Sequence, residues 1–132
     1  MLKDINFQRI ESIAVAVIPD EKEDGIWKAF LLNQTDFILK TVMVSSKGYG
    51  DIDGKLKETA TLRWILNDMP PQSFQPIEEI PDELRLLNNE FLISFVINGK
   101  LLDKKVIFVP ESIQETFYID VPLLNQKGVL IR

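Results

Sequence analysis

The sequence predicts an all-β protein: a two-sheet immunoglobulin-like sandwich of about eight strands, with one short helix near residues 81–88. Short apolar runs recur along the chain with turn residues between them, which is the pattern of an all-β domain. Apolar side chains alternate within these runs, and in some runs both faces are apolar. Two packed sheets would bury such faces, and a partly closed β-barrel is the alternative. The 132 residues, 45% of them apolar, fit a single domain over residues 1–132.

The first three predicted strands are residues 12–18, 26–32 and 37–46. In the first strand Val15 lies among β-branched residues on one face, whereas Ala14 and Ala16 lie on the other and allow close packing. Pro19 ends this strand. In the third strand Lys40 is expected to face water.

A hairpin tip is predicted over residues 47–57, because it holds two glycines and the dipeptide Asp53-Gly54, a type I′ turn signal. In the next strand, residues 58–66, the apolar residues 60, 62, 64 and 66 alternate with the polar residues 59, 61 and 63. Trp64 is therefore expected to point inward and Arg63 outward.

The segment 73–80 reads as an edge strand, because Pro76 cannot donate a hydrogen bond to a neighbouring strand. Pro81 suits the first position of a helix over residues 81–88, and Asp82 and Glu83 suit its N-terminal dipole.

Three further strands are predicted after this helix, with a short edge pairing from the tail 123–132. Asn98-Gly99 is the clearest hairpin turn in the chain and joins the first two of them. The three strands are residues 90–97, 100–109 and 115–121.

The composition excludes several classes of enzyme. The chain has no cysteine, so it has no disulfide, thiolate nucleophile or cysteine metal site. It has no histidine, so serine–histidine hydrolysis and histidine-based zinc or haem sites are excluded. We therefore predict no catalytic residue, no cofactor and no metal.

The formal charge is −5, and the lysines lie among acidic residues. A nucleic-acid-binding protein usually has a basic face, so no nucleic-acid partner is expected. The N-terminal residues 1–6 carry no apolar run of signal-peptide length, and the apolar stretch 13–18 is too short to cross a bilayer. The expected location is the cytoplasm, without membrane binding.

The polar segment 45–55 fails the tests of three kinds of site. A phosphate loop needs four residues between its glycines, but five separate Gly48 from Gly54, and Leu56 replaces the hydroxyl residue. A calcium loop would place Tyr49 first and Ala60 last, and neither is a ligand. A serine–lysine site would need Ser45 or Ser46 beside a desolvated Lys47, and Ser46 is disfavoured because adjacent strand residues point to opposite faces.

Other candidate residues have structural interpretations. Glu78, Glu79, Asp82 and Glu83 are read as a solvated edge and a helix N-terminus, because glycosidase-type chemistry needs two facing carboxylates. Trp27 and Trp64 alternate with apolar residues, so core packing is predicted for both.

The leading functional hypothesis is a non-enzymatic module that binds another protein or itself. Tyr49, with Lys47, is predicted to be exposed on the loop tip, where aromatic residues often make contacts. The edge residues Ser73, Phe74 and Gln75 are the second predicted contact. The alternatives are a small-ligand or carbohydrate-binding module using a tryptophan, and an enzyme using carboxylates or Lys47.

Several segments resemble a family of short, uncharacterised bacterial proteins, some of which carry the label phenylalanyl-tRNA synthetase subunit. The segments are KAFLLN (28–33), VSSKGY (44–49), ETATLR (58–63), LNNEF (87–91), DKK (103–105) and KGVL (127–130).

The label implies a role in aminoacylation. A synthetase catalytic domain needs a larger antiparallel sheet carrying ATP-binding arginines, and this chain has only four arginines: Arg9, Arg63, Arg85 and Arg132. The resemblance therefore implies at most an accessory role beside a synthetase.

Overall fold

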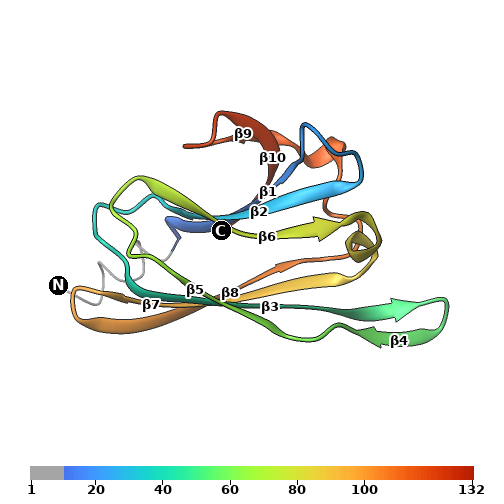
Figure 1. The fold of residues 1–132 in the computed structure, drawn as a ribbon, viewed down its shortest axis with the longest axis horizontal. Coiled ribbons are helices and arrows are strands. Elements are labelled where there is room, and N and C mark those ends of the chain that lie inside the picture. Colours follow the sequence, from blue (N-terminus) through green and yellow to red (C-terminus); the bar gives the residue numbers. More distant parts are fainter. Residues whose placement is uncertain (1–10) are drawn as a thin grey trace.

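Two antiparallel sheets face each other in the computed structural model, which describes residues 11–132 (Figure 1). Residues 1–6 and Arg9, which entered the predictions above, lie outside the described residues. The sandwich predicted from the sequence is confirmed, and the sheets do not close into the alternative barrel.

The first sheet, called sheet I, has the strand order β6-β2-β1-β10-β9. Its strands are β1 (Ile13–Pro19), β2 (Ile26–Asn33), β6 (Ser73–Pro81), β9 (Ile119–Val121) and β10 (Gln126–Ile131). Sheet II has the order β4-β3-β7-β8, and β5 pairs with β3 beyond the end of β4. Its strands are β3 (Lys40–Ile52), β4 (Lys55–Glu58), β5 (Leu62–Leu66), β7 (Asn88–Ile97) and β8 (Lys100–Phe108).

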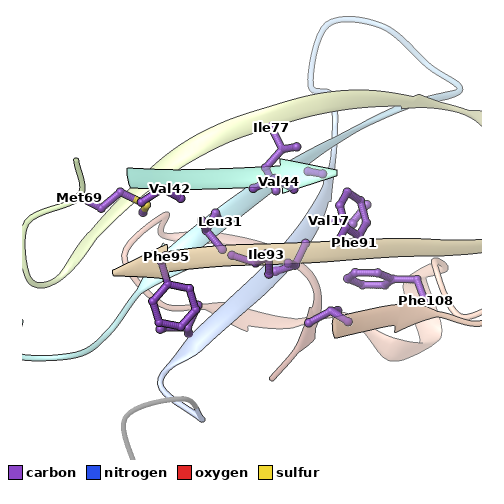
Figure 2. Packing of buried hydrophobic residues seen from close by; sticks show 14 of the residues in the cluster. Val17, Leu31, Val42, Val44, Met69, Ile77, Phe91, Ile93, Phe95 and Phe108 are labelled. Carbon is purple, nitrogen blue, oxygen red and sulfur yellow. The ribbon is translucent and has the colours of Figure 1, made fainter. Parts of the chain in front are cut away.

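The main core fills the space between the sheets, where alternate residues of most strands point inward (Figure 2). Val15, Val17 and Leu31 of sheet I are buried in the same cluster as Phe91 and Phe95 of sheet II. The rings of Phe91 and Phe108 meet edge to face, 6.0 Å apart. Period-two alternation, read from the sequence, is what places these side chains together.

A second, smaller cluster lies on the outer face of sheet I. Ala14, Ala16 and Ile18 of β1 are buried there with Leu32 and Val121. The segment around β9 curls over this face (Figure 1). Both faces of β1 are therefore buried, as the apolar run 13–18 predicts.

Both predicted type I′ turns are confirmed by their backbone angles. Asp53 and Gly54 have φ values of 54° and 77° between β3 and β4, and Asn98 and Gly99 have 51° and 75° between β7 and β8. Two successive residues with positive φ are what this turn requires.

The predicted hairpin tip over residues 47–57 is wrong in extent, because β3 continues to Ile52. Gly48 lies inside this strand, where a Cβ atom would come 3.2 Å from Thr59 Cγ2 and 3.4 Å from Leu87 Cδ1. This glycine permits close packing inside the strand and makes no turn.

Three other predictions at element ends are corrected. The helix near 81–88 is a five-residue 3₁₀ helix, η1 (Asp82–Leu86), and Pro81 belongs to the end of β6. The predicted strand 115–121 is the 3₁₀ helix η2 (Glu115–Phe117) followed by the three residues of β9. The tail is not an edge, because β10 lies between β1 and β9.

Candidate functional site

Lys47 and Tyr49, two of the predicted contact residues, lie in β3 on the outer face of sheet II and not on a free loop. In the strand register Lys47 lies opposite Glu90 of β7, and Tyr49 lies opposite Asn88. The Tyr49 hydroxyl donates a hydrogen bond to Glu90 Oε1 at 3.2 Å, and Lys47 Nζ lies 3.9 Å from Glu90 Oε2. Desolvation raises the pKa of the Tyr49 hydroxyl. The hydrogen bond to Glu90 and the negative charge of Glu90 raise it further. Tyr49 is thus a half-buried member of a polar cluster.

Ser73, Phe74 and Gln75 lie on β6, which is an edge strand as predicted. The Phe74 ring meets the Phe30 ring edge to face at 5.9 Å. The Gln75 side chain donates a hydrogen bond to the carbonyl of Asn67. These residues belong to sheet I, so the structure does not bring the two predicted contact sets together.

An apolar cluster that the sequence analysis missed lies on the outer face of sheet II; we call it the outer patch. It consists of Met43, Ile65 and Leu92, which are 46%, 85% and 41% exposed. In the strand register Met43 faces Ile65, and Leu92 faces Ser45 beside Met43. A shallow depression of about 270 Å³ lies between Met43, Ile65 and Leu92.

The signal for the outer patch is present in the sequence. Alternation assigns Met43, Ile65 and Leu92 to the water-facing side of their strands, where polar residues are expected. Apolar residues at several such positions indicate a contact surface once the strand order brings them together.

A second candidate site is a cavity of about 210 Å³ between the sheets. Its walls come from β3, β6, β7 and η1, and from residues 59–62, where the edge of sheet II breaks between β4 and β5. Ile80, Leu84 and Phe91 form its apolar walls. Ala60 and Leu62 of its lining are exposed, so the cavity reaches the surface at this break.

The side chain of Glu78 lines this cavity because of a β-bulge in β6. Phe30 of β2 pairs with Pro76, but the next residue, Ala29, pairs with Glu78, so Ile77 is the extra residue. Ala29 is fully buried, and the bulge turns Glu78 to the same inner side. The prediction that Glu78 is solvated with Glu79 is wrong for Glu78, and Glu79 alone is exposed.

Burial raises the pKa of the Glu78 carboxyl above its ordinary value. A hydrogen bond from Ser46 favours the ionised form and opposes this rise. Ser46 comes from β3 in sheet II, so the interaction spans the two sheets.

Both tryptophans are partly buried and pack against the main core, as predicted. Trp27 Nε1 donates to the Tyr118 hydroxyl at 3.1 Å, and the Arg85 guanidinium lies 4.2 Å from the centre of the Trp27 ring. Trp64 shares one wall of the shallow depression in the outer patch.

Within residues 11–132 no group of three or more acidic residues is placed to hold a metal ion. Glu90 also lines the inter-sheet cavity, but its carboxylate contacts Tyr49 and Lys47 on the other side of the sheet. A pair of carboxylates facing each other, as glycoside hydrolysis needs, is therefore not formed by Glu78 and Glu90.

No helix in the described part of the chain is long and apolar enough to cross a membrane. A scan against protein-family models and searches of curated proteins and of solved structures found no match to this chain. The family resemblance drawn from the sequence therefore stays a prediction.

Proposed function

We propose that this chain is a non-catalytic protein-binding module, an immunoglobulin-like sandwich that contacts its partner through the outer patch. The exposed apolar cluster of Met43, Ile65 and Leu92 is the observation that carries the proposal. Contiguous apolar surface on a small domain marks an interaction site, because its burial is favourable by roughly 25 cal/mol per Å².

The edges formed by β6 and β8 are less suited to binding than this face. In β6 the edge is interrupted by Pro76 and by the bulge at Ile77. In β8 the edge strand turns Lys104 inward, where its Nζ donates to the Ile13 carbonyl at 2.6 Å. Proline, bulges and inward-pointing charges are devices that prevent pairing with another strand.

The charges near the outer patch indicate the chemistry of the partner. Lys47, Arg63 and Lys105 lie on the same face, with Glu90 and Asp103. Basic residues therefore outnumber acidic ones here, in a chain of net charge −5. A partner with an apolar centre and an acidic rim would complement this surface. Lys47 and Tyr49, predicted as contacts, would lie at its rim.

The test is site-specific photo-crosslinking in the cells that make the protein. The crosslinker replaces Ile65 in the outer patch or, as a control, Leu56, which is 88% exposed on the hairpin of β3 and β4. We expect one stoichiometric crosslinked partner from position 65, none from position 56, and loss of that product when Leu92→Asp is added.

Equal capture from both positions, or a product insensitive to Leu92→Asp, would overturn the proposal. Analytical ultracentrifugation of the purified protein identifies the case in which the partner is a second copy. Capture of synthetase subunits would support the accessory role that the family resemblance implies. The absence of cysteine supports a reducing compartment such as the cytoplasm as the place of action.

A small-ligand-binding role is a second candidate, favoured by the inter-sheet cavity with its single inward carboxyl group. A ligand in this cavity would not contact Trp27 or Trp64, whereas the ligand-binding alternative drawn from the sequence uses a tryptophan.

A further inference from the structure

The uncharged polar side chains that line the inter-sheet cavity, Ser46, Thr59 and Asn89, already use their hydrogen-bond donors. Asn89 Nδ2 donates to the carbonyls of Leu84 at 2.8 Å and Leu87 at 3.2 Å. The Thr59 hydroxyl donates to the Ala60 carbonyl at 3.0 Å and accepts the Gly48 amide at 2.8 Å. The Ser46 hydroxyl bonds to the Glu78 carboxyl group.

What these side chains can still do is accept hydrogen bonds. Asn89 has only its amide oxygen left, and the Glu78 carboxylate has lone pairs beyond the one that Ser46 uses. The Lys47 ammonium group, which could have neutralised Glu78, lies instead beside Glu90, 3.9 Å from Oε2. A neutral hydrogen-bond acceptor or an anion would find no free donor among Ser46, Thr59 and Asn89.

We infer that this cavity binds a small alkylammonium group, with its charge on the Glu78 carboxylate and its alkyl chain against Ile80, Leu84 and Phe91. The cation would form a charge-assisted hydrogen bond with Glu78 and could donate a second one to Asn89 Oδ1. The apolar walls strengthen this attraction, because charges interact more strongly where the surroundings are less polar than water.

The size and mouth of the cavity fit such a ligand. At about 210 Å³ it is smaller than the roughly 300–1,000 Å³ of sites for drug-sized molecules. It has room for one short chain entering past Ala60 and Leu62. The ammonium group belongs either to a free amine or to the lysine side chain of a protein partner, and both present the same chemistry to Glu78.

The test titrates the purified, isotopically labelled protein with n-butylammonium chloride and follows the backbone amide signals by NMR. Sodium chloride keeps the ionic strength constant, and n-butanol is the neutral probe of similar shape. We expect n-butylammonium to shift the amide signals of residues lining the cavity, and n-butanol to bind at least tenfold more weakly.

Glu79→Gln is the matched control for Glu78→Gln, because it makes the same charge change one residue away on an exposed side chain. We expect Glu78→Gln to weaken the binding of n-butylammonium at least tenfold and Glu79→Gln to leave it unchanged. Ala60→Trp, which narrows the mouth and leaves Glu78 intact, should also weaken it. This variant tests the site even if Glu78→Gln alters the fold.

The source of the amine is resolved by a second probe, N-acetyl-lysine-methylamide. Binding as tight as that of n-butylammonium, with the same dependence on Glu78, assigns the site to a partner's lysine, whereas weaker binding assigns it to a free amine. Three results would overturn the inference: no shifts around the cavity, equal binding of n-butanol, or equal losses from Glu78→Gln and Glu79→Gln. The test uses no protein partner, so its outcome is independent of the outer patch.

Discussion

The Arg85 guanidinium stacks on the Trp27 ring at 4.2 Å and donates through Nη1 to the Ile113 carbonyl at 2.7 Å. One side chain of η1 thereby joins β2 to the segment before η2. A cation over an aromatic face contributes about 0.5–2 kcal/mol, and a hydrogen bond contributes about 1 kcal/mol.

Replacement of Arg85 should therefore destabilise the fold. We expect Arg85→Ala to lower the free energy of unfolding by about 1–3 kcal/mol and to shift the fluorescence of Trp27, measured in a Trp64→Phe background. Arg63→Ala, which removes an exposed arginine, should change neither. Equal effects of the two substitutions in urea denaturation would contradict this prediction.

Asn33 is a fully buried polar residue that holds three segments together. Its Nδ2 lies within hydrogen-bond distance of the carbonyls of Phe37, Met69 and Pro70, and its Oδ1 accepts from Thr35. We expect Asn33→Ala to cost about 2–4 kcal/mol of stability, because it leaves buried partners unsatisfied. Thermal and urea denaturation measure this cost, and a change below about 1 kcal/mol would refute the assignment.

Gly128 lies where β10 passes close to β1. A Cβ atom there would lie 2.6 Å from the Val17 carbonyl oxygen and 2.5 Å from Ile18 Cγ2. We expect Gly128→Ala to destabilise the protein by at least about 2 kcal/mol, because backbone atoms must move to admit one methyl group. Lys127→Ala, at the exposed neighbouring position, is the control for urea denaturation and should have little effect.

Glu78 should make stability depend on pH. Its pKa in the folded protein is raised above the ordinary value of 4.5, so the folded state holds this proton more tightly than the unfolded chain does. The contribution of Glu78 to stability is therefore most favourable at pH values below its pKa in the unfolded chain. It falls as the pH rises through the pKa of Glu78 in the folded protein, and it stays low at higher pH.

Glu78→Gln removes the ionisable carboxyl group and therefore the loss of stability that follows its ionisation. We expect the variant to gain stability over the natural protein as the pH rises from acidic to neutral, in urea denaturations at a series of pH values. Lys47 and Glu90 also line the cavity and are unchanged in both proteins. Glu79→Gln should give a curve parallel to that of the natural protein. A parallel curve for Glu78→Gln would show that its carboxyl is as solvated as that of Glu79.

The residues whose role depends on local alternation were predictable. Val15, Val17 and Phe91 reach the main core because side chains alternate along a strand, and the two type I′ turns follow from Asp53-Gly54 and Asn98-Gly99. Neither property depends on which strands become neighbours.

The position of Glu78 was not predictable in this way. One extra residue, Ile77, changes the face on which Glu78 lies, and a single sequence does not show where the register shifts. The glycines around Tyr49 predict a turn, whereas the structure places Tyr49 within β3. The missing side chain of Gly48 leaves room for Thr59 and Leu87, which come close to it only in the folded chain.

The pairing of β1 with β10 has a consequence for how the protein is made. Val15 of β1 pairs with Ile131 of β10, so sheet I is complete only after β10 has been synthesised. Until then Ala14, Ala16 and Ile18 of β1 lack part of their apolar cover on the emerging chain. Contacts between distant residues slow folding, typically to roughly milliseconds to seconds for all-β domains. We expect β1 to need protection from aggregation during synthesis, because its apolar faces form long before their cover arrives.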